Sequence, residues 1–187
     1  MKKNCLLLFV ISVLLTGCYK DYGGFGDISQ CEGLQETIDK IKNSPIIDDK
    51  VLLETLQTTR LAKINEYYKQ NNGEWEYLHM LSSHSSTILC FENEAYTFSK
   101  YVFDDEIKIF GPYPLTYDAD TNTFYTTSQI HNTEHKAVVK YFDGEIIILD
   151  GLFMPEYDMY NEDYAEYRFI TTFRLEKEGR EYYEGLL

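Results

Sequence analysis

The spacing of apolar residues along the chain changes near Trp75, from a helical period to an alternating one. Before that point apolar residues first recur every three or four positions, as they do on one face of a helix: Cys31, Leu34, Ile38 and Ile41. Ser29 and Glu32 have the spacing of a capping box at the start of this helix. The helix is expected to end before Pro45, because a residue that precedes proline disfavours helical backbone angles.

A second, longer helix is predicted from about residue 50 to residue 69. Asp48 or Asp49 can cap its first turn, since a carboxylate accepts hydrogen bonds from the free N–H groups there. Its apolar positions include Leu53, Leu56, Ile64 and Tyr67. The sequence Asn71-Asn72-Gly73 is expected to terminate it, because glycine and asparagine accept the left-handed conformation that ends many helices.

From Trp75 onward the alternation of apolar and polar residues predicts short strands. The candidates are residues 74–82, 86–92, 95–103, 106–110, 113–117, 123–130, 135–142, 145–150 and 167–177. Asp143-Gly144 is typical of a two-residue hairpin turn, which joins two of these strands within residues 136–150. The last strand alternates clearly, with one face carrying Tyr167, Phe169, Thr171, Phe173 and Leu175.

Taken together, the elements predict an α+β fold in which two N-terminal helices are followed by an antiparallel β meander. Short strands joined by short turns favour antiparallel pairing, and closure into a barrel would remove the exposed sheet edges. We expect a single domain over residues 29–187, because the chain shows no internal repeat and its length suits one hydrophobic core. Residues 18–28, rich in Gly and Asp, are expected to form a flexible tether.

The first residues of the chain have the features of an export signal. Lys2 and Lys3 precede an apolar run from Leu6 to Leu15, which is shorter than the roughly 20 residues that span a bilayer. The run ends in Leu15-Thr16-Gly17-Cys18, which resembles the lipobox of bacterial lipoproteins. The resemblance implies that residues 1–17 are a signal peptide and that Cys18 carries the lipid.

Membership of the lipoprotein family would anchor the protein to a membrane through Cys18. Each buried methylene of an acyl chain contributes about 0.8 kcal/mol, so two or three chains hold a protein essentially permanently. In that family, aspartate after the cysteine favours retention in the inner membrane, and this chain has Tyr19 there. The expected location is therefore the cell envelope, at the outer membrane.

The composition limits the kinds of molecule that this protein can bind. Removing residues 1–17 takes away two lysines and no acidic residue, which changes the formal net charge from −14 to −16. A surface this acidic repels nucleic acid, so we expect no nucleic-acid partner. An aromatic content of 16%, mostly Tyr and Phe, argues against disorder and favours strands.

A second resemblance concerns the body of the protein. Gly73-Glu74-Trp75 follows helical sequence and opens the first predicted strand, where it resembles the G-x-W signature of the lipocalin superfamily. The resemblance implies a barrel over about residues 73–177, with Trp75 closing the base and packing against Arg168 or Arg174. The T-D-Y-type turn of that superfamily is absent. A cystatin-like helix on a curled antiparallel sheet is the alternative fold.

Two cysteines remain once Cys5 is removed with the signal and Cys18 is lipidated. Cys31 and Cys90 could form a disulfide in the oxidising envelope, which would stabilise the fold by about 4 kcal/mol in the chain-entropy model. They could equally stay as two buried thiols. A bond requires Cα atoms within about 7 Å of one another.

Motifs for metal binding are incomplete. The segment from His131 to His135 reads H-x-x-E-H, but that motif needs a helix, and this segment lies between predicted strands. Asp118, Asp120 and Asn122 match the first ligands of an EF-hand loop, yet the required glycine is replaced by Thr123. We therefore expect two polar turns and no metal or other cofactor.

The chain offers no recognisable catalytic arrangement of nucleophile, base or phosphate-binding loop, so an enzyme is the least favoured of three open functional classes. Tyrosines recur at helical spacing after Pro155 and are either ligand-binding groups or core residues: Tyr157, Tyr160, Tyr164 and Tyr167. The first expectation is a binding module for a small or hydrophobic ligand. The alternative is an envelope interaction or structural lipoprotein that binds a protein partner through its acidic surface.

Overall fold

The computed structural model describes residues 24–29, 31–44, 47–58, 61–78, 84–90, 94–103, 106–127, 134–151 and 168–187. Within these ranges α2 (Leu34–Lys42) and α3 (Asp49–Thr58) precede the strands, and α4 (Arg180–Glu184) follows them. None of these helices has the length and apolarity that a membrane crossing requires. The strands are β1 (Leu61–Asn71), β2 (Glu74–Leu78), β3 (His84–Cys90), β4 (Ala95–Phe103), β5 (Glu106–Asp118), β6 (Thr123–Thr127), β7 (Glu134–Phe142), β8 (Ile146–Gly151) and β9 (Arg168–Glu176).

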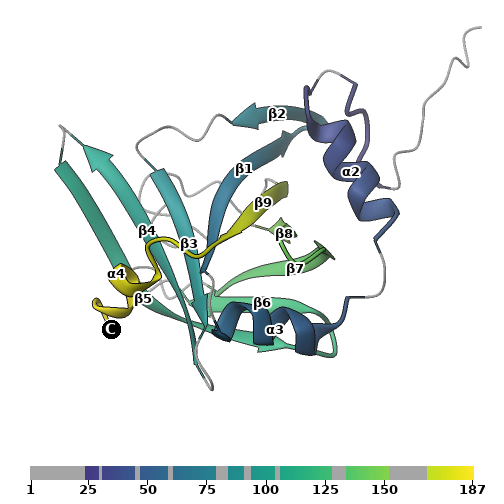
Figure 1. Ribbon diagram of the computed structural model, residues 1–187. Coiled ribbons are helices and arrows are strands. Elements are labelled where there is room, and N and C mark those ends of the chain that lie inside the picture. The colour runs from purple at the N-terminus through teal and green to yellow at the C-terminus, as the bar shows by residue number, and fades with distance from the viewer. Residues whose placement is uncertain are drawn as a thin grey trace, which may run out of the picture.

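The sheet is a closed antiparallel barrel of eight strands, with β2 as an addition at its side (Figure 1). From β3 to β9 each strand pairs with the next along the chain, and β9 returns to pair with β1 over most of its length. The other edge of β1 is shared, since Ala62 and Lys63 pair with β3 and residues 67–71 pair with β2. The expected meander is confirmed, and the open curled sheet is wrong because the pairing of β1 with β9 closes it.

The prediction of a helix from residue 50 to residue 69 is correct only as far as Thr58. Asp48 caps α3 as expected, with its Oδ1 accepting a hydrogen bond from the N–H of Val51 at 3.1 Å. From Leu61 the chain is a strand bonded on both edges, and tertiary pairing of this kind overrides local periodicity. A bulge between Ile64 and Glu66 shifts the alternation by one residue, which produces the three-residue spacing that imitated a helix.

Two turns differ from the sequence expectation. Asn72 and Gly73 have φ angles of 50° and 87° and form the tight turn between β1 and β2, so Asn-Gly starts a hairpin and does not end a helix. Between β7 and β8 the central residues are Gly144, with φ 92°, and Glu145. Asp143 flanks that turn, and its carboxylate accepts hydrogen bonds from the N–H groups of Glu145 and Ile146.

The boundaries of most strands agree with the alternation. β4 has the expected bounds, and the predicted 106–110 and 113–117 are one strand, β5, whose register shifts across Gly111 and Pro112. A bulge tolerates proline inside a strand, because the ladder is already interrupted there. The hairpin within residues 136–150 is confirmed as β7 and β8.

Apolar side chains form a separate core on each side of the barrel wall. The inner core lies inside the barrel and receives Leu52 and Leu56 of α3, which covers one end, called the base here (Figure 1). The outer core lies under α2 on the outside of the wall and contains Phe25, Ile28, Cys31, Leu34, Ile38, Tyr68, Trp75, Ile148 and Ile170. Full burial of a large apolar side chain contributes about 1.5–3 kcal/mol, so both cores stabilise the fold strongly.

Candidate functional site

Along β4 the inner face of the barrel changes from apolar to polar with distance from the base. Ala95 packs on the inner core, and alternation along β4 therefore directs Thr97 and Ser99 to the same inner side. Phe98 lies on the opposite face, where its ring packs at 5.1 Å from that of Tyr183 in α4. Ser99 is four residues further from the base than Ala95, or about 13 Å along the strand.

Other inward-facing polar side chains lie in the same half of the barrel. We call this set the polar belt: Thr97, Ser99, Tyr113, Thr126, His135 and Thr171. Directly paired residues of neighbouring strands lie on the same face of the sheet, and Thr97 pairs with Tyr113, Thr126 with His135, and Thr171 with Leu149. The hydroxyl of Thr126 donates to the carbonyl oxygen of Pro114 at 2.8 Å, and that of Thr171 to Gly151 at 2.7 Å. The Ser99 residue is 1% exposed, and its hydroxyl has no hydrogen-bond partner among the residues that the structure describes.

Hydrogen bonds from Arg180 to the backbone of α3 fix this helix over the base of the barrel. The Arg180 guanidinium donates hydrogen bonds to the carbonyl oxygens of Leu56 and Gln57, at 2.9 and 3.2 Å, and to that of Cys90 at 3.0 Å. A cation at the C-terminus of a helix also interacts favourably with the helix dipole. The apolar end of the barrel is therefore the structural end, and the polar belt is the better candidate for binding.

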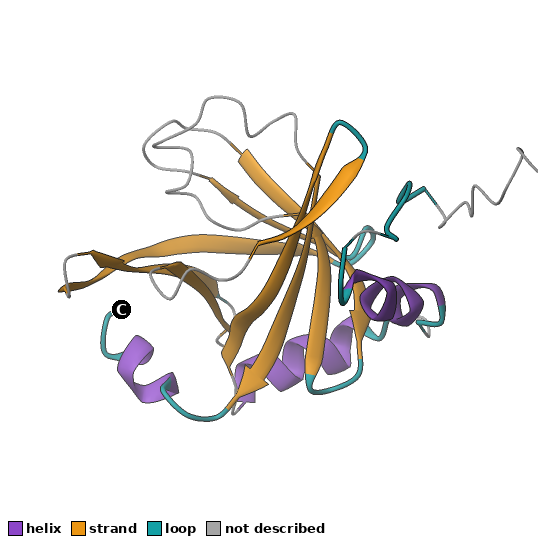
Figure 2. Ribbon diagram, turned by 90° about the horizontal axis from the view of Figure 1, so that it is seen from above, coloured by secondary structure: helices purple, strands orange, loops and turns teal. Residues whose placement is uncertain are grey.

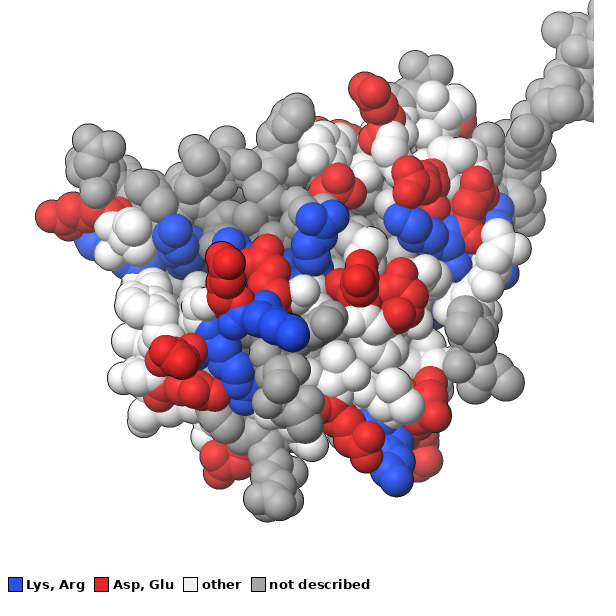
Figure 3. Space-filling view, viewed as in Figure 1, with Lys and Arg blue, Asp and Glu red and all other residues white. Residues whose placement is uncertain are grey.

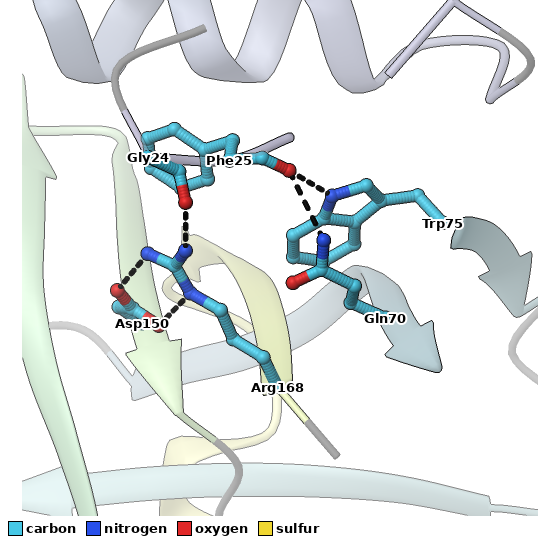
Figure 4. Close-up of polar contacts among 6 residues, drawn as sticks. All are labelled: Gly24, Phe25, Gln70, Trp75, Asp150 and Arg168. Atoms are coloured by element: carbon cyan, nitrogen blue, oxygen red, sulfur yellow. Dashed lines mark hydrogen bonds and ion pairs between the residues drawn. The ribbon is translucent and has the colours of Figure 1, made fainter. Parts of the chain in front are cut away.

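A second cluster of polar contacts fixes residues 24–28, called the N-terminal strap, to the outside of the wall (Figure 4). Trp75 Nε1 and Gln70 Nε2 both donate to the carbonyl oxygen of Phe25, at 2.6 and 3.1 Å. Arg168 Nη1 donates to the carbonyl oxygen of Gly24 at 2.8 Å. Phe25 and Ile28 are 5% and 1% exposed, so the strap is part of the folded domain. The expectation of a tether over the whole of residues 18–28 is wrong for the strap.

Arg168 links the strap to the barrel through an ion pair with two parallel hydrogen bonds. Its Nε and Nη2 atoms lie 3.1 and 2.7 Å from the two carboxylate oxygens of Asp150. The guanidinium also stacks on the ring of Phe25, 4.4 Å from the ring centroid. Bidentate pairing and stacking restrict the arginine to one orientation, which directs its remaining N–H groups to Gly24.

The expected position of Trp75 is wrong in detail. Trp75 is buried, but it belongs to the outer core and contacts the strap, whereas α3 closes the base. The guanidinium of Arg168 stacks on the ring of Phe25 and not on the indole of Trp75. Arg174, the other candidate for packing against the indole, is exposed. The physical reason is that β2 pairs outside the closed barrel, so its side chains cannot reach the interior.

Of the two alternatives for Cys31 and Cys90, the structure has the two buried free thiols and not the disulfide. Cys31 packs in the outer core and Cys90 in the inner core, with the barrel wall between them. Burial raises the pKa of Cys90 to about 12, against a smaller opposing effect of Arg180. Burial, and then the charge of Glu76, raises the pKa of Cys31. Neither thiol is activated as a nucleophile.

The two incomplete metal motifs have structural roles where the structure describes them. Glu134 and His135 open β7 and so lie in a strand, not in the helix that the zincin motif requires. Asp118 accepts hydrogen bonds from the N–H of Asp120 at 2.9 Å and from the hydroxyl of Thr121 at 2.8 Å. Both of its carboxylate oxygens are thus used within the predicted turn.

Three predicted features lie outside the described residues. These are the lipidated Cys18, the start of the H-x-x-E-H segment at residues 131–133, and the tyrosines at positions 157, 160, 164 and 167. Sequence reasoning in turn missed the strap and the polar belt. The aromatic Phe25, flanked by Gly24 and Gly26, is a signal that could have indicated a docked segment.

Comparison with known proteins adds no family assignment. No protein-family model matches the chain, and no curated protein matches it.

Proposed function

We propose that this protein is an exported lipoprotein with a lipocalin-like barrel that binds a small ligand in the half of the barrel opposite α3. The ligand has an apolar part, which faces the inner core, and a hydrogen-bonding part, which faces the polar belt. The observation that carries this proposal is the buried Ser99 hydroxyl without a partner. Leaving such a group unpaired costs about 1–3 kcal/mol, and a bound ligand would offset that cost.

The charge distribution gives less support to the alternative, a protein partner bound through the acidic surface. On the face shown in Figure 3, acidic side chains lie next to Lys and Arg side chains. Ion pairs at the surface of the protein include Lys63–Glu176 and Lys69–Glu76. A mixed surface of this kind favours solubility more than it favours one cationic partner.

Native mass spectrometry of the mature protein, purified from its own cell envelope, tests ligand binding. We expect the wild type to carry a retained mass, and both Ser99→Ala and Ser99→Leu to lose it. Thr172 supplies a matched control, because its hydroxyl is also buried and unpartnered but lies on the outer side of the wall. Thr172→Val should retain the ligand; equal retention in the Ser99 and Thr172 variants would contradict the proposed site.

Lipid anchoring is tested separately by metabolic labelling with an acyl-chain analogue. Cys18→Ser should remove the label, and the protein should be released or remain unprocessed at the inner membrane. Cys5→Ser is the control and should keep the label, since that residue lies within the proposed signal peptide. Full labelling of Cys18→Ser would show that the lipid is attached elsewhere.

A further inference from the structure

The N-terminal strap fixes the point at which the chain leaves the folded domain. Two of its carbonyl oxygens, those of Gly24 and Phe25, accept hydrogen bonds from side chains of three strands. The donors are Gln70 of β1, Trp75 of β2 and Arg168 of β9. Gly26 adds to this fit, because its φ of 72° suits glycine and a Cβ there would lie 3.2 Å from Gln70 Nε2. The strap is therefore held by specific contacts along its length.

The chain between the strap and Cys18 is short. Gly24 follows Cys18 by six residues, and six fully extended residues reach at most about 20 Å. A compact domain of this size is about 40 Å across. The lipid on Cys18 consequently cannot reach all sides of the barrel, and the wall around the strap must stay near the bilayer.

We propose that the barrel wall carrying the strap, β2 and α2 faces the phospholipid bilayer in which the acyl chains of Cys18 are inserted. This inference rests on the proposed lipid anchoring and names the surface that anchoring brings to the membrane. The opposite side carries α4, which lies across the barrel from α2 in both Figure 1 and Figure 2. α4 and the neighbouring part of β4 then point away from the bilayer, toward the solvent.

Förster transfer from the protein to a labelled lipid measures this orientation. One dye is attached at Glu74→Cys, on β2 beside Trp75, and in a second protein at Glu181→Cys, on α4. Both positions are exposed, whereas the native Cys31 and Cys90 are buried and react slowly. The lipidated protein is placed in phosphatidylethanolamine and phosphatidylcholine vesicles that contain a rhodamine-headgroup lipid. Transfer from position 74 should exceed that from position 181 by about twofold or more, given the width of the domain.

A flexible insertion supplies the control for the length of the anchor. About 12 Gly and Ser residues placed before Gly24 leave the strap contacts intact but free the domain to turn. The difference between the two positions should then largely disappear. Equal transfer from both positions without the insertion, in protein that still floats with the vesicles, would overturn the orientation and leave the anchoring proposal standing. Failure of the folded wild type to float with vesicles would overturn both.

Discussion

The two faces of the barrel wall are buried by different means. The inner core contains buried apolar side chains from seven strands and α3, whereas the outer core combines apolar packing under α2 with polar contacts to the strap. Apolar burial is roughly proportional to area and has little directionality, while hydrogen bonds and ion pairs require defined geometry. The inner core therefore determines how stable the barrel is, and the polar contacts determine where the N-terminal segment lies.

Truncation in the inner core should have the largest effect on stability. Phe173 is fully buried there, so Phe173→Ala should lower the free energy of unfolding by about 3–5 kcal/mol through lost burial and the cavity left behind. Urea denaturation followed by circular dichroism measures the change. Val51→Ala, at an exposed position of α3, is the control and should change stability by less than about 0.5 kcal/mol. Similar values for both variants would mean that the inner core is not the main source of stability.

Loss of the arginine that holds the strap should have a smaller effect on stability and a specific effect on Trp75. Arg168→Ala removes hydrogen bonds to Asp150 and Gly24 at a partly exposed site, which should cost about 1–3 kcal/mol. Trp75, the only tryptophan of the chain, should shift its emission to the red and become accessible to iodide as the strap loosens. Arg174→Ala, on the exposed side of the same strand, should change neither property. An unchanged Trp75 spectrum in Arg168→Ala would show that the strap is held without the arginine.

Loss of the side-chain cap of α3 should lower the free energy of unfolding by about 1 kcal/mol, whereas α2 has no side-chain cap to lose. Asp48→Ala should destabilise the protein by about that amount, because the side chain caps α3. Ser29→Ala should cost less than about 0.5 kcal/mol, since α2 begins at Leu34 after Gly33, with φ 82° and no side-chain cap. Thermal melts of the two variants compare the caps directly. A cost for Ser29→Ala equal to that for Asp48→Ala would restore the capping box that the sequence suggested.

Reduction should have no effect on stability. Because Cys31 and Cys90 are free thiols, the denaturation midpoint should be the same with and without reductant, and both thiols should be alkylated in denaturant without reduction. In the native protein Cys31 should react before Cys90, since loosening of the outer layer exposes it without opening the barrel. Mass mapping of alkylated peptides over time measures the order. Faster reaction of Cys90 would mean that the base opens more readily than the outer layer.

The sequence by itself determined the elements whose burial is local and regular. Alternation located β4 and the β7–β8 hairpin, and helical spacing identified Leu34 and Ile38 as buried residues of α2. These predictions succeeded because the period of two or of 3.6 residues reflects which face of an element is buried. β8 was also predicted, although it lacks the alternation of the other strands. Ile147, Ile148 and Leu149 are all buried, because α2 covers one face of β8 and the barrel interior covers the other.

Tertiary structure decided the features that depend on distant partners. β1 is a strand because β9, more than 100 residues later, pairs with it, and its bulge had hidden the strand period. Closure of the barrel placed Ser99 inside, Trp75 outside, and the wall between Cys31 and Cys90. Local periodicity carries no information on which strands meet, whereas long-range pairing fixes both the curvature of the sheet and the face on which each of these residues is buried.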